Sequence, residues 1–139
     1  MSLNEAWDFF SSPNNLSKIT PPEMRFVTHT SLSKGKIYPG QIISYSLRPL
    51  LGIKFRWITE ITHVIDQHLF VDEQRFGPYK FWHHLHRFEC LNGSVVMEDL
   101  VNYALPFGII GRIAHRLFIR KELENIFNYR EKVLLELFK

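Results

Sequence analysis

Hydrophobic residues alternate with polar ones through the middle of the chain and recur at three- and four-residue steps near its end. Alternation is typical of β-strands with one buried face, whereas the longer steps are typical of an amphipathic helix. The alternating segments predict about six strands, at residues 25–30, 41–50, 54–65, 69–76, 80–90 and 94–105. Residues 107–138 follow the helical pattern, and at ~1.5 Å per residue they form a rod of roughly 45 Å, which can cross a whole sheet.

Two short helices are expected before the strands. Ser2, with Glu5 three residues later, forms the pattern of a capping box, so a helix begins near residue 3. Ser12-Pro13 ends that helix and starts a second helical turn, which closes at Pro21-Pro22. The order of elements predicts a single α+β domain over residues 1–139, with an antiparallel sheet and the long helix on one of its faces.

Two irregularities are expected within this pattern. Pro49 lies near the end of its strand, which indicates an edge strand or a bulge. Gly108 and Gly111 weaken the first turns of the long helix, so we expect it to bend or fray there.

Composition fits a globular domain with a substantial core, because 45% of the 139 residues are apolar and 14% are aromatic. The single cysteine, Cys90, excludes an intrachain disulfide framework and fits a reducing compartment. The chain starts with polar residues, and no segment approaches the ~20 apolar residues that span a bilayer. We therefore expect a cytoplasmic protein.

The formal net charge of +3 is concentrated in the C-terminal segment. Residues 107–139 hold seven Lys or Arg against four Asp or Glu, whereas the first 106 residues hold ten of each. A solvated helix face is one interpretation, and attraction to an anionic membrane surface or to an acidic ligand is the functional alternative. Nucleic-acid binding is not expected, because no recognition motif accompanies the charge. The basic residues concerned, with no acid between them, are Arg112, Arg116, Arg120 and Lys121.

The dipeptide Asn92-Gly93 is a strong hairpin signal, because both central positions of a type I′ turn favour positive φ. A turn there places Leu91 opposite Ser94 and His86 opposite Asp99. The same register places His84 opposite Val101, Trp82 opposite Tyr103 and Phe88 opposite Met97, all on one face of the sheet.

A second hairpin precedes this one. A three-residue loop at 77–79 would place Asp72 opposite His84 and Gln74 opposite Trp82, on the same face as His86 and Asp99. A slip of one residue in this pairing would turn Asp72 and Gln74 to the other side. The shared face combines an apolar wall with a few polar groups, which is typical of a ligand pocket.

Ligand contacts are therefore expected from this face, from the neighbouring strands and from the first half of the long helix. The expected residues are Trp57, Phe70, Asp72, Gln74, Phe76, Trp82, His84, His86, Phe88, Asp99, Tyr103, Ile110, Ala114 and Leu117.

The facing pair His86 and Asp99 has three interpretations. It is a satisfied polar pair that fixes the register, a contact to a ligand, or a general acid–base pair in which Asp99 orients the imidazole. His84, His86 and Asp99 could also hold zinc, while alternation turns His83 to the other face. No cysteine set or helical histidine pair supports a metal site, so no metal or cofactor is expected.

Several runs resemble uncharacterised bacterial members of the START-like superfamily, which also contains polyketide cyclase/dehydrase-like and coenzyme Q-binding proteins. The resemblance covers nearly the whole chain. It rests on Phe70-Val71-Asp72-Glu73-Gln74, Gly77-Pro78, Trp82-x-His84-x-His86-x-Phe88, Asn92-Gly93, Asp99, Tyr103, Leu105-Pro106 and Gly108-x-x-Gly111-Arg112-x-Ala114-x-Arg116-x-Phe118.

The resemblance implies a helix-grip fold, in which a curved antiparallel sheet surrounds a long C-terminal helix and encloses a cavity. It also implies that a small hydrophobic molecule, such as a lipid, quinone or polyketide, binds in that cavity. A cyclase or dehydratase that uses His86 and Asp99 is the enzymatic alternative. A regulatory or membrane-surface interaction without catalysis is the third.

The sequence departs from the superfamily at its start. Members begin with a strand that pairs with the last strand, whereas here the helix signal starts at residue 3. Strand 94–105 would then have an open edge. We therefore expect a homodimer formed through this edge, or reduced stability.

Overall fold

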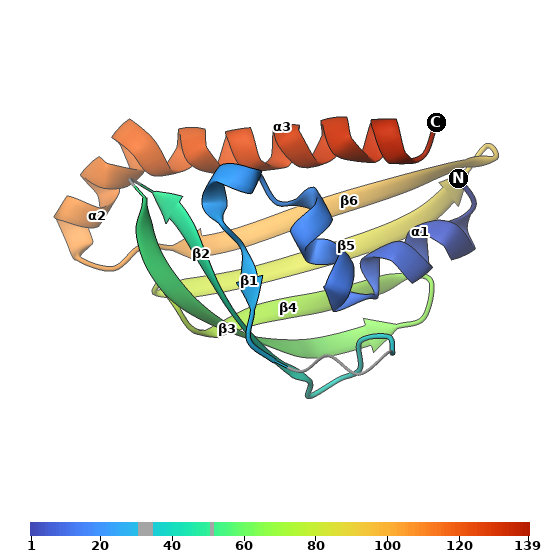
Figure 1. Ribbon diagram of the computed structural model, residues 1–139, viewed down its shortest axis with the longest axis horizontal. Coiled ribbons are helices and arrows are strands. Elements are labelled where there is room, and N and C mark those ends of the chain that lie inside the picture. Colours follow the sequence, from blue (N-terminus) through green and yellow to red (C-terminus); the bar gives the residue numbers. More distant parts are fainter. Residues whose placement is uncertain (31–34, 51) are drawn as a thin grey trace.

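The computed structural model describes residues 1–30, 35–50 and 52–139. It has the predicted α+β architecture, a curved, open antiparallel sheet with strand order β1-β2-β3-β4-β5-β6 and a long C-terminal helix along one side (Figure 1). The strands are β1 (Val27–Thr28), β2 (Ile42–Leu50), β3 (Ile53–Ile65), β4 (Leu69–Phe76), β5 (Phe81–Leu91) and β6 (Ser94–Ala104).

Short helices precede the sheet, and the C-terminal helix follows it. The N-terminal helices are α1 (Leu3–Phe10) and the 3₁₀ turns η1 (Pro13–Ile19) and η2 (Pro22–Met24). The C-terminal helix consists of α2 (Gly108–Ala114), a π-helical turn η3 (His115–Ile119) and α3 (Arg120–Leu137). Ser2 caps α1 as predicted, because its hydroxyl accepts from the Glu5 amide and the Glu5 carboxylate accepts from the Ser2 amide.

The inner face of the sheet carries two hydrophobic clusters. In the first, Trp7 of α1 packs edge-on against Phe70 and Phe88, with ring centroids 6.0 and 5.5 Å apart. In the second, Trp57 and Trp82 pack edge-on at 5.2 Å beneath α3. The N-terminal helices and α3 therefore cover the same face, toward which β3, β4 and β5 direct their aromatic side chains.

The predicted hairpin registers are confirmed. Asn92 and Gly93 have φ of 52° and 79°, as a type I′ turn requires, and His86 lies opposite Asp99. Asp72 lies opposite His84, as the three-residue loop predicted.

The expected pair of Gln74 and Trp82 does not form, because the pairing of β4 with β5 ends at Glu73 and His83. Gln74 instead holds the loop, since its Nε2 donates to the Tyr79 carbonyl and its Oε1 accepts from the Tyr79 amide.

The expected irregularities also have structural counterparts. The pairing of β2 with β3 shifts between Leu47 and Leu50, which places a bulge at Pro49. The long helix is disturbed at η3, one turn later than its glycines suggested. Gly111 serves close packing instead, because a Cβ at this position would clash with the Pro106 carbonyl oxygen.

The last strand, β6, pairs with β5 on one side and with no strand of the described residues on the other. Its outer-face residues Val96 and Leu100 are 44% and 49% exposed. Among the described helices, none combines the length and apolar character needed to cross a membrane.

Candidate functional site

A cavity of about 170 Å³ lies between the inner face of the sheet, η1 and α3. Its walls are mostly aromatic and aliphatic, and its carboxylate, imidazole and guanidinium groups come from β4, β5 and α3. The lining side chains include Phe10, Leu16, Ile19, Met24, Phe26, Ile43, Tyr45, Leu47, Trp57, Thr59, Ile61, Phe70, Asp72, Tyr79, Trp82, His84, His86, Leu123, Ile126, Phe127 and Arg130.

The structure brings six of the expected ligand contacts together in this wall: Trp57, Phe70, Asp72, Trp82, His84 and His86. Two others stand one layer behind it. Phe88 is 1% exposed and packs against Trp7 and Phe10, and Asp99 contacts the histidines from behind.

The expected contacts at the strand ends lie elsewhere. Phe76 is 60% exposed because the pairing of β4 with β3 skips Arg75. Phe76 therefore pairs with Ile58 on the outer face, whereas Gln74 pairs with Thr59 on the inner face. The Gln74 side chain is hydrogen-bonded to the backbone of Tyr79 in the adjoining loop, and Tyr103 is hydrogen-bonded to His115 of η3.

The expected contacts from the long helix are also misplaced. Ile110 and Leu117 are 74% and 60% exposed, because α3 rather than α2 covers the cavity. Ala114 lines a second, apolar cavity of about 200 Å³ between the C-terminal helix and the far end of the sheet. Leu123 and Ile126 line both cavities and separate them.

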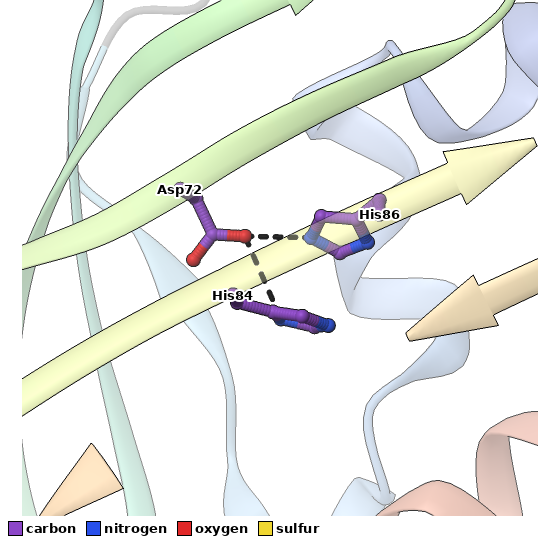
Figure 2. Close-up of side chains that lie close together, drawn as sticks. All are labelled: Asp72, His84 and His86. Atoms are coloured by element: carbon purple, nitrogen blue, oxygen red, sulfur yellow. Dashed lines mark hydrogen bonds and ion pairs between the residues drawn. The ribbon is translucent and has the colours of Figure 1, made fainter. Parts of the chain in front are cut away.

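Two histidines and two aspartates of adjacent strands form a compact polar network, here called the His–Asp cluster: Asp72, His84, His86 and Asp99. His86 Nε2 donates to Asp72 Oδ2, and His84 Nε2 donates to Asp99 Oδ1, each at a distance of 2.7 Å. These short bonds run diagonally between the strands. Figure 2 shows Asp72 on β4 beside both imidazoles on β5.

The contacts straight across the strands are longer. His86 Nδ1 lies 3.0 Å from Asp99 Oδ1 but off the direction of its N–H, so this contact is an ion pair rather than a straight hydrogen bond. His84 Nδ1 lies 3.6 Å from Asp72 Oδ2. Each carboxylate therefore serves both imidazoles, whose ring centroids are 3.7 Å apart.

The two histidines shift in opposite directions. Burial lowers the pKa of His84, and the charge of His86 beside it lowers that pKa further. Burial also opposes the charged form of His86, but Asp72 and Asp99 outweigh it and raise the pKa of that imidazole. The cluster therefore favours the charged form of His86 over the charged form of His84.

Both aspartates stay ionised despite their burial. Burial would raise the pKa of the Asp72 carboxyl, but the charges of His84, His86 and Arg130, with the hydrogen bond from His86, bring it below its ordinary value. Burial likewise opposes ionisation of Asp99, yet the contacts with His84 and His86 hold its pKa well below the usual range.

The sequence suggested His84, His86 and Asp99 as metal ligands, whereas the structure gathers Asp72 with the two histidines. Their ligand atoms all lie within 4.8 Å of one another, and the three side chains line the cavity. Such a set could hold a divalent cation if His86 lost the proton that it donates to Asp72. The hydrogen bond from His86 to Asp72 and the raised pKa of His86 favour a proton at this place.

Arg130 of α3 is a wall residue that the sequence interpretation missed. It is 9% exposed, and its guanidinium lies 5.1 Å from the centre of the Phe127 ring. A signal for it exists, because Arg130 follows Ile126 by four residues and Phe127 by three and so continues their inward-facing stripe. A cation on the apolar stripe of a helix indicates a buried charge.

Comparison of the sequence with family models and with curated proteins finds no match. Solved structures do match the fold. Protein Ms6760 from Mycobacterium smegmatis is 16% identical with a TM-score of 0.65, over 97% of this chain and 85% of that one. The protein TTHA0849 from Thermus thermophilus is 13% identical with a TM-score of 0.62, over 96% and 91% of the two chains.

A protein from Staphylococcus epidermidis, solved by NMR in solution, is 13% identical with a TM-score of 0.65, over 99% of this chain and 85% of its own. At such identities, these matches establish a similar arrangement of the sheet and the C-terminal helix. They do not assign a function to this chain.

Proposed function

We propose that this protein binds a small hydrophobic molecule in the cavity beneath α3. The observation that carries the proposal is the cavity itself, whose aromatic walls surround a buried His–Asp cluster and a buried arginine. Apolar walls with a few placed polar groups are typical of small-molecule sites. The resemblance to the START-like superfamily supports the same function, since many of its members bind lipids, quinones or polyketides.

The arrangement of the cluster favours binding over acid–base catalysis. Both nitrogens of His86 face carboxylates, and His84 directs Nε2 to Asp99 and Nδ1 toward Asp72. A general base needs a nitrogen within hydrogen-bond reach of the reacting group. With their nitrogens committed to aspartates, the imidazoles present mainly their ring edges and faces to a bound molecule.

Native mass spectrometry of the freshly purified protein tests this proposal, with a copurified hydrophobic molecule as the expected result. The matched variants are Thr59→Phe, which fills the cavity from a 4% exposed position, and Arg56→Phe, which adds the same ring to an exposed position of β3. We expect Thr59→Phe to lose the bound molecule and Arg56→Phe to keep it. Equal occupancy in both variants would refute binding in this cavity.

A second function has an observation of its own. The first half of the C-terminal helix exposes large apolar side chains next to its basic ones, a combination here called the apolar–basic surface. Interleaved apolar and basic residues suit an anionic lipid surface, into which the apolar groups insert while the cations meet headgroups. Its apolar members are Phe107, Ile109, Ile110, Ile113, Leu117 and Phe118, between 54% and 81% exposed, and its basic members are Arg112, Arg116, Arg120 and Lys121.

We propose that this surface brings the protein to anionic membranes, where a hydrophobic ligand is found. Flotation with phosphatidylglycerol vesicles should recover the protein, and phosphatidylcholine vesicles should not. Raising the salt to about 1 M, where the Debye length falls to ~3 Å, should weaken the binding. Equal recovery on both lipids would contradict the role of the basic residues.

A further inference from the structure

Arg130 is a buried cation that makes no direct ion pair with an anion of the described residues. Its side chain lines the cavity, is 9% exposed, and forms no ion pair or hydrogen bond with any residue that the structure describes. Residues 31–34 and 51, which lie outside the described part, are serine, leucine and lysine and include no acid. The guanidinium lies over the Phe127 ring, and its charge also helps to lower the pKa of Asp72, without a direct contact between the two groups.

A guanidinium keeps its charge in proteins, so burial cannot be relieved by loss of a proton. A buried charge is costly unless it is paired and hydrogen-bonded. The stacking on Phe127 compensates for only part of this cost. The unused hydrogen-bond donors of Arg130 therefore stand ready for an acceptor that enters the cavity.

The His–Asp cluster does not take this place. No oxygen of Asp72 or Asp99 lies within the 4.0 Å of an ion pair with Arg130, and the closest hydrogen-bond donors to both carboxylates are the imidazoles. The His–Asp cluster and Arg130 therefore line the same cavity without a direct contact between their charged groups.

We propose that Arg130 binds the anionic head of the cavity's ligand, and that this ligand is a hydrophobic carboxylic acid. The inference rests on the proposed function, because it assigns the chemical class of the molecule bound there. A guanidinium matches a carboxylate with two parallel hydrogen bonds. Arg130 is the one guanidinium or ammonium group among the described lining residues, and the other ionised groups there pair with one another, so the site suits a single negative charge better than the double charge of a phosphate monoester.

Two ligand pairs with matched apolar parts test the inference: decanoic acid with 1-decanol, and 2-naphthoic acid with 2-naphthalenemethanol. Binding is followed by the fluorescence of Trp57 and Trp82, which line the cavity, at about pH 7.5, where both acids are ionised. We expect the wild-type protein to bind each acid roughly 10-fold or more tightly than its alcohol, as for a hydrogen bond to a charged group. This comparison needs no variant.

Arg130→Met should remove the preference for the acids over the alcohols. Arg130→Lys should keep part of the preference, since it keeps the charge but loses the fork geometry. Arg120→Met is the matched control, because Arg120 is exposed on the same helix and pairs with Glu124 at its surface. It should keep the full preference.

Three outcomes would overturn the inference. Equal binding of acids and alcohols by the wild-type protein would refute the carboxylate while the proposed function stands. A preference that persists in Arg130→Met, or disappears in Arg120→Met as well, would refute the assignment to Arg130. Binding of neither acids nor alcohols would refute the inference and the proposed function together.

Discussion

The two halves of the C-terminal helix treat charge and apolar surface in opposite ways. α3 covers Leu123, Ile126 and Phe127 with the sheet and buries a cation, Arg130, among them. The first half exposes isoleucines as well as arginines, with Ile110 74% exposed. Folding alone favours buried apolar groups and solvated charges. α3 departs from this rule because it buries a charge, and the first half departs from it because it exposes apolar side chains.

The contrast suggests that the two halves of the helix have different roles. A buried charge in an apolar wall indicates recognition inside the protein, and exposed apolar side chains beside cations indicate contact with something outside it. The π-helical turn η3, over His115–Ile119, lies where the two halves meet. π-Helical turns often occur at functional positions in helices. A π-helical turn changes the helical phase, so we infer that residues after η3 can face the cavity while residues before it face outward.

The largest effect is expected from breaking the buried charges of the cavity. In Asp99→Asn the carboxylate that serves both imidazoles is lost, which leaves the charge of His86 half compensated. Removing one partner of a buried ion pair lowers the free energy of unfolding by about 3 kcal/mol or more. Urea denaturation of Asp99→Asn should therefore show a decrease of this size.

The neighbouring substitution Glu98→Gln is the control. Glu98 pairs with Arg87 on the exposed outer face of the same strand, where ion pairs contribute ~0–1 kcal/mol. Similar losses in the two variants would show that the inner cluster is no more important for stability than a surface pair.

The pH dependence of stability should separate the members of the cluster. Because the pKa values of Asp72 and Asp99 are lowered on folding, their contribution is complete above about pH 4 and is lost as the pH falls through the folded values. The raised pKa of His86 adds stability below about pH 6.5 that is lost at higher pH, whereas the lowered pKa of His84 does the opposite.

The two histidines therefore partly cancel near neutrality, and the steep loss should occur below about pH 4. NMR of the ring nitrogens should show His86 protonated at a pH where His84 is neutral. Parallel titration of both rings near pH 6.5 would contradict the description of the cluster.

A smaller effect is expected from the outer surface. Ile110→Asp places a negative charge in the apolar–basic surface and should reduce binding to phosphatidylglycerol vesicles by roughly 10-fold. Leu135→Asp is the control, because Leu135 is a 66% exposed leucine in the last turns of the same helix. A reduction of equal size in both variants would point to net charge rather than to the surface itself.

The smallest effect concerns the open edge of β6. Light scattering with size exclusion should detect a dimer paired through this strand, and Leu100→Lys should weaken it by roughly 10-fold, or ~1.4 kcal/mol. Ile53→Lys is the control, since Ile53 is 52% exposed on β3. A monomeric, thermally stable wild-type protein would refute pairing through the edge.

The sheet could be predicted closely because local signals determine it. Asn92-Gly93 fixes the turn and thereby the register of every residue in β5 and β6. The cluster of Asp72, His84, His86 and Asp99 follows from that register and from the next loop. Its diagonal hydrogen bonds could not be predicted, since they depend on side-chain rotamers rather than on pairing.

The errors arose where the backbone departs from regular periods. The skipped Arg75 turned Phe76 outward, a one-residue irregularity without a glycine or proline signal at that position. Ile110 and Leu117 were expected in the cavity because periodicity gives the faces of a helix but not which half of it covers the sheet. Arg130 was overlooked because its charge suggested a solvated position, although its spacing placed it inside.

The most direct test of ligand binding is an NMR titration of the ¹⁵N-labelled wild-type protein with 2-naphthoate. Binding in the cavity predicts saturable shifts centred on Trp57, Trp82, Phe127 and Arg130, with little change at Ile110 and Leu117. Shifts confined to the exposed first half of the helix, or no saturable shifts at all, would contradict the account.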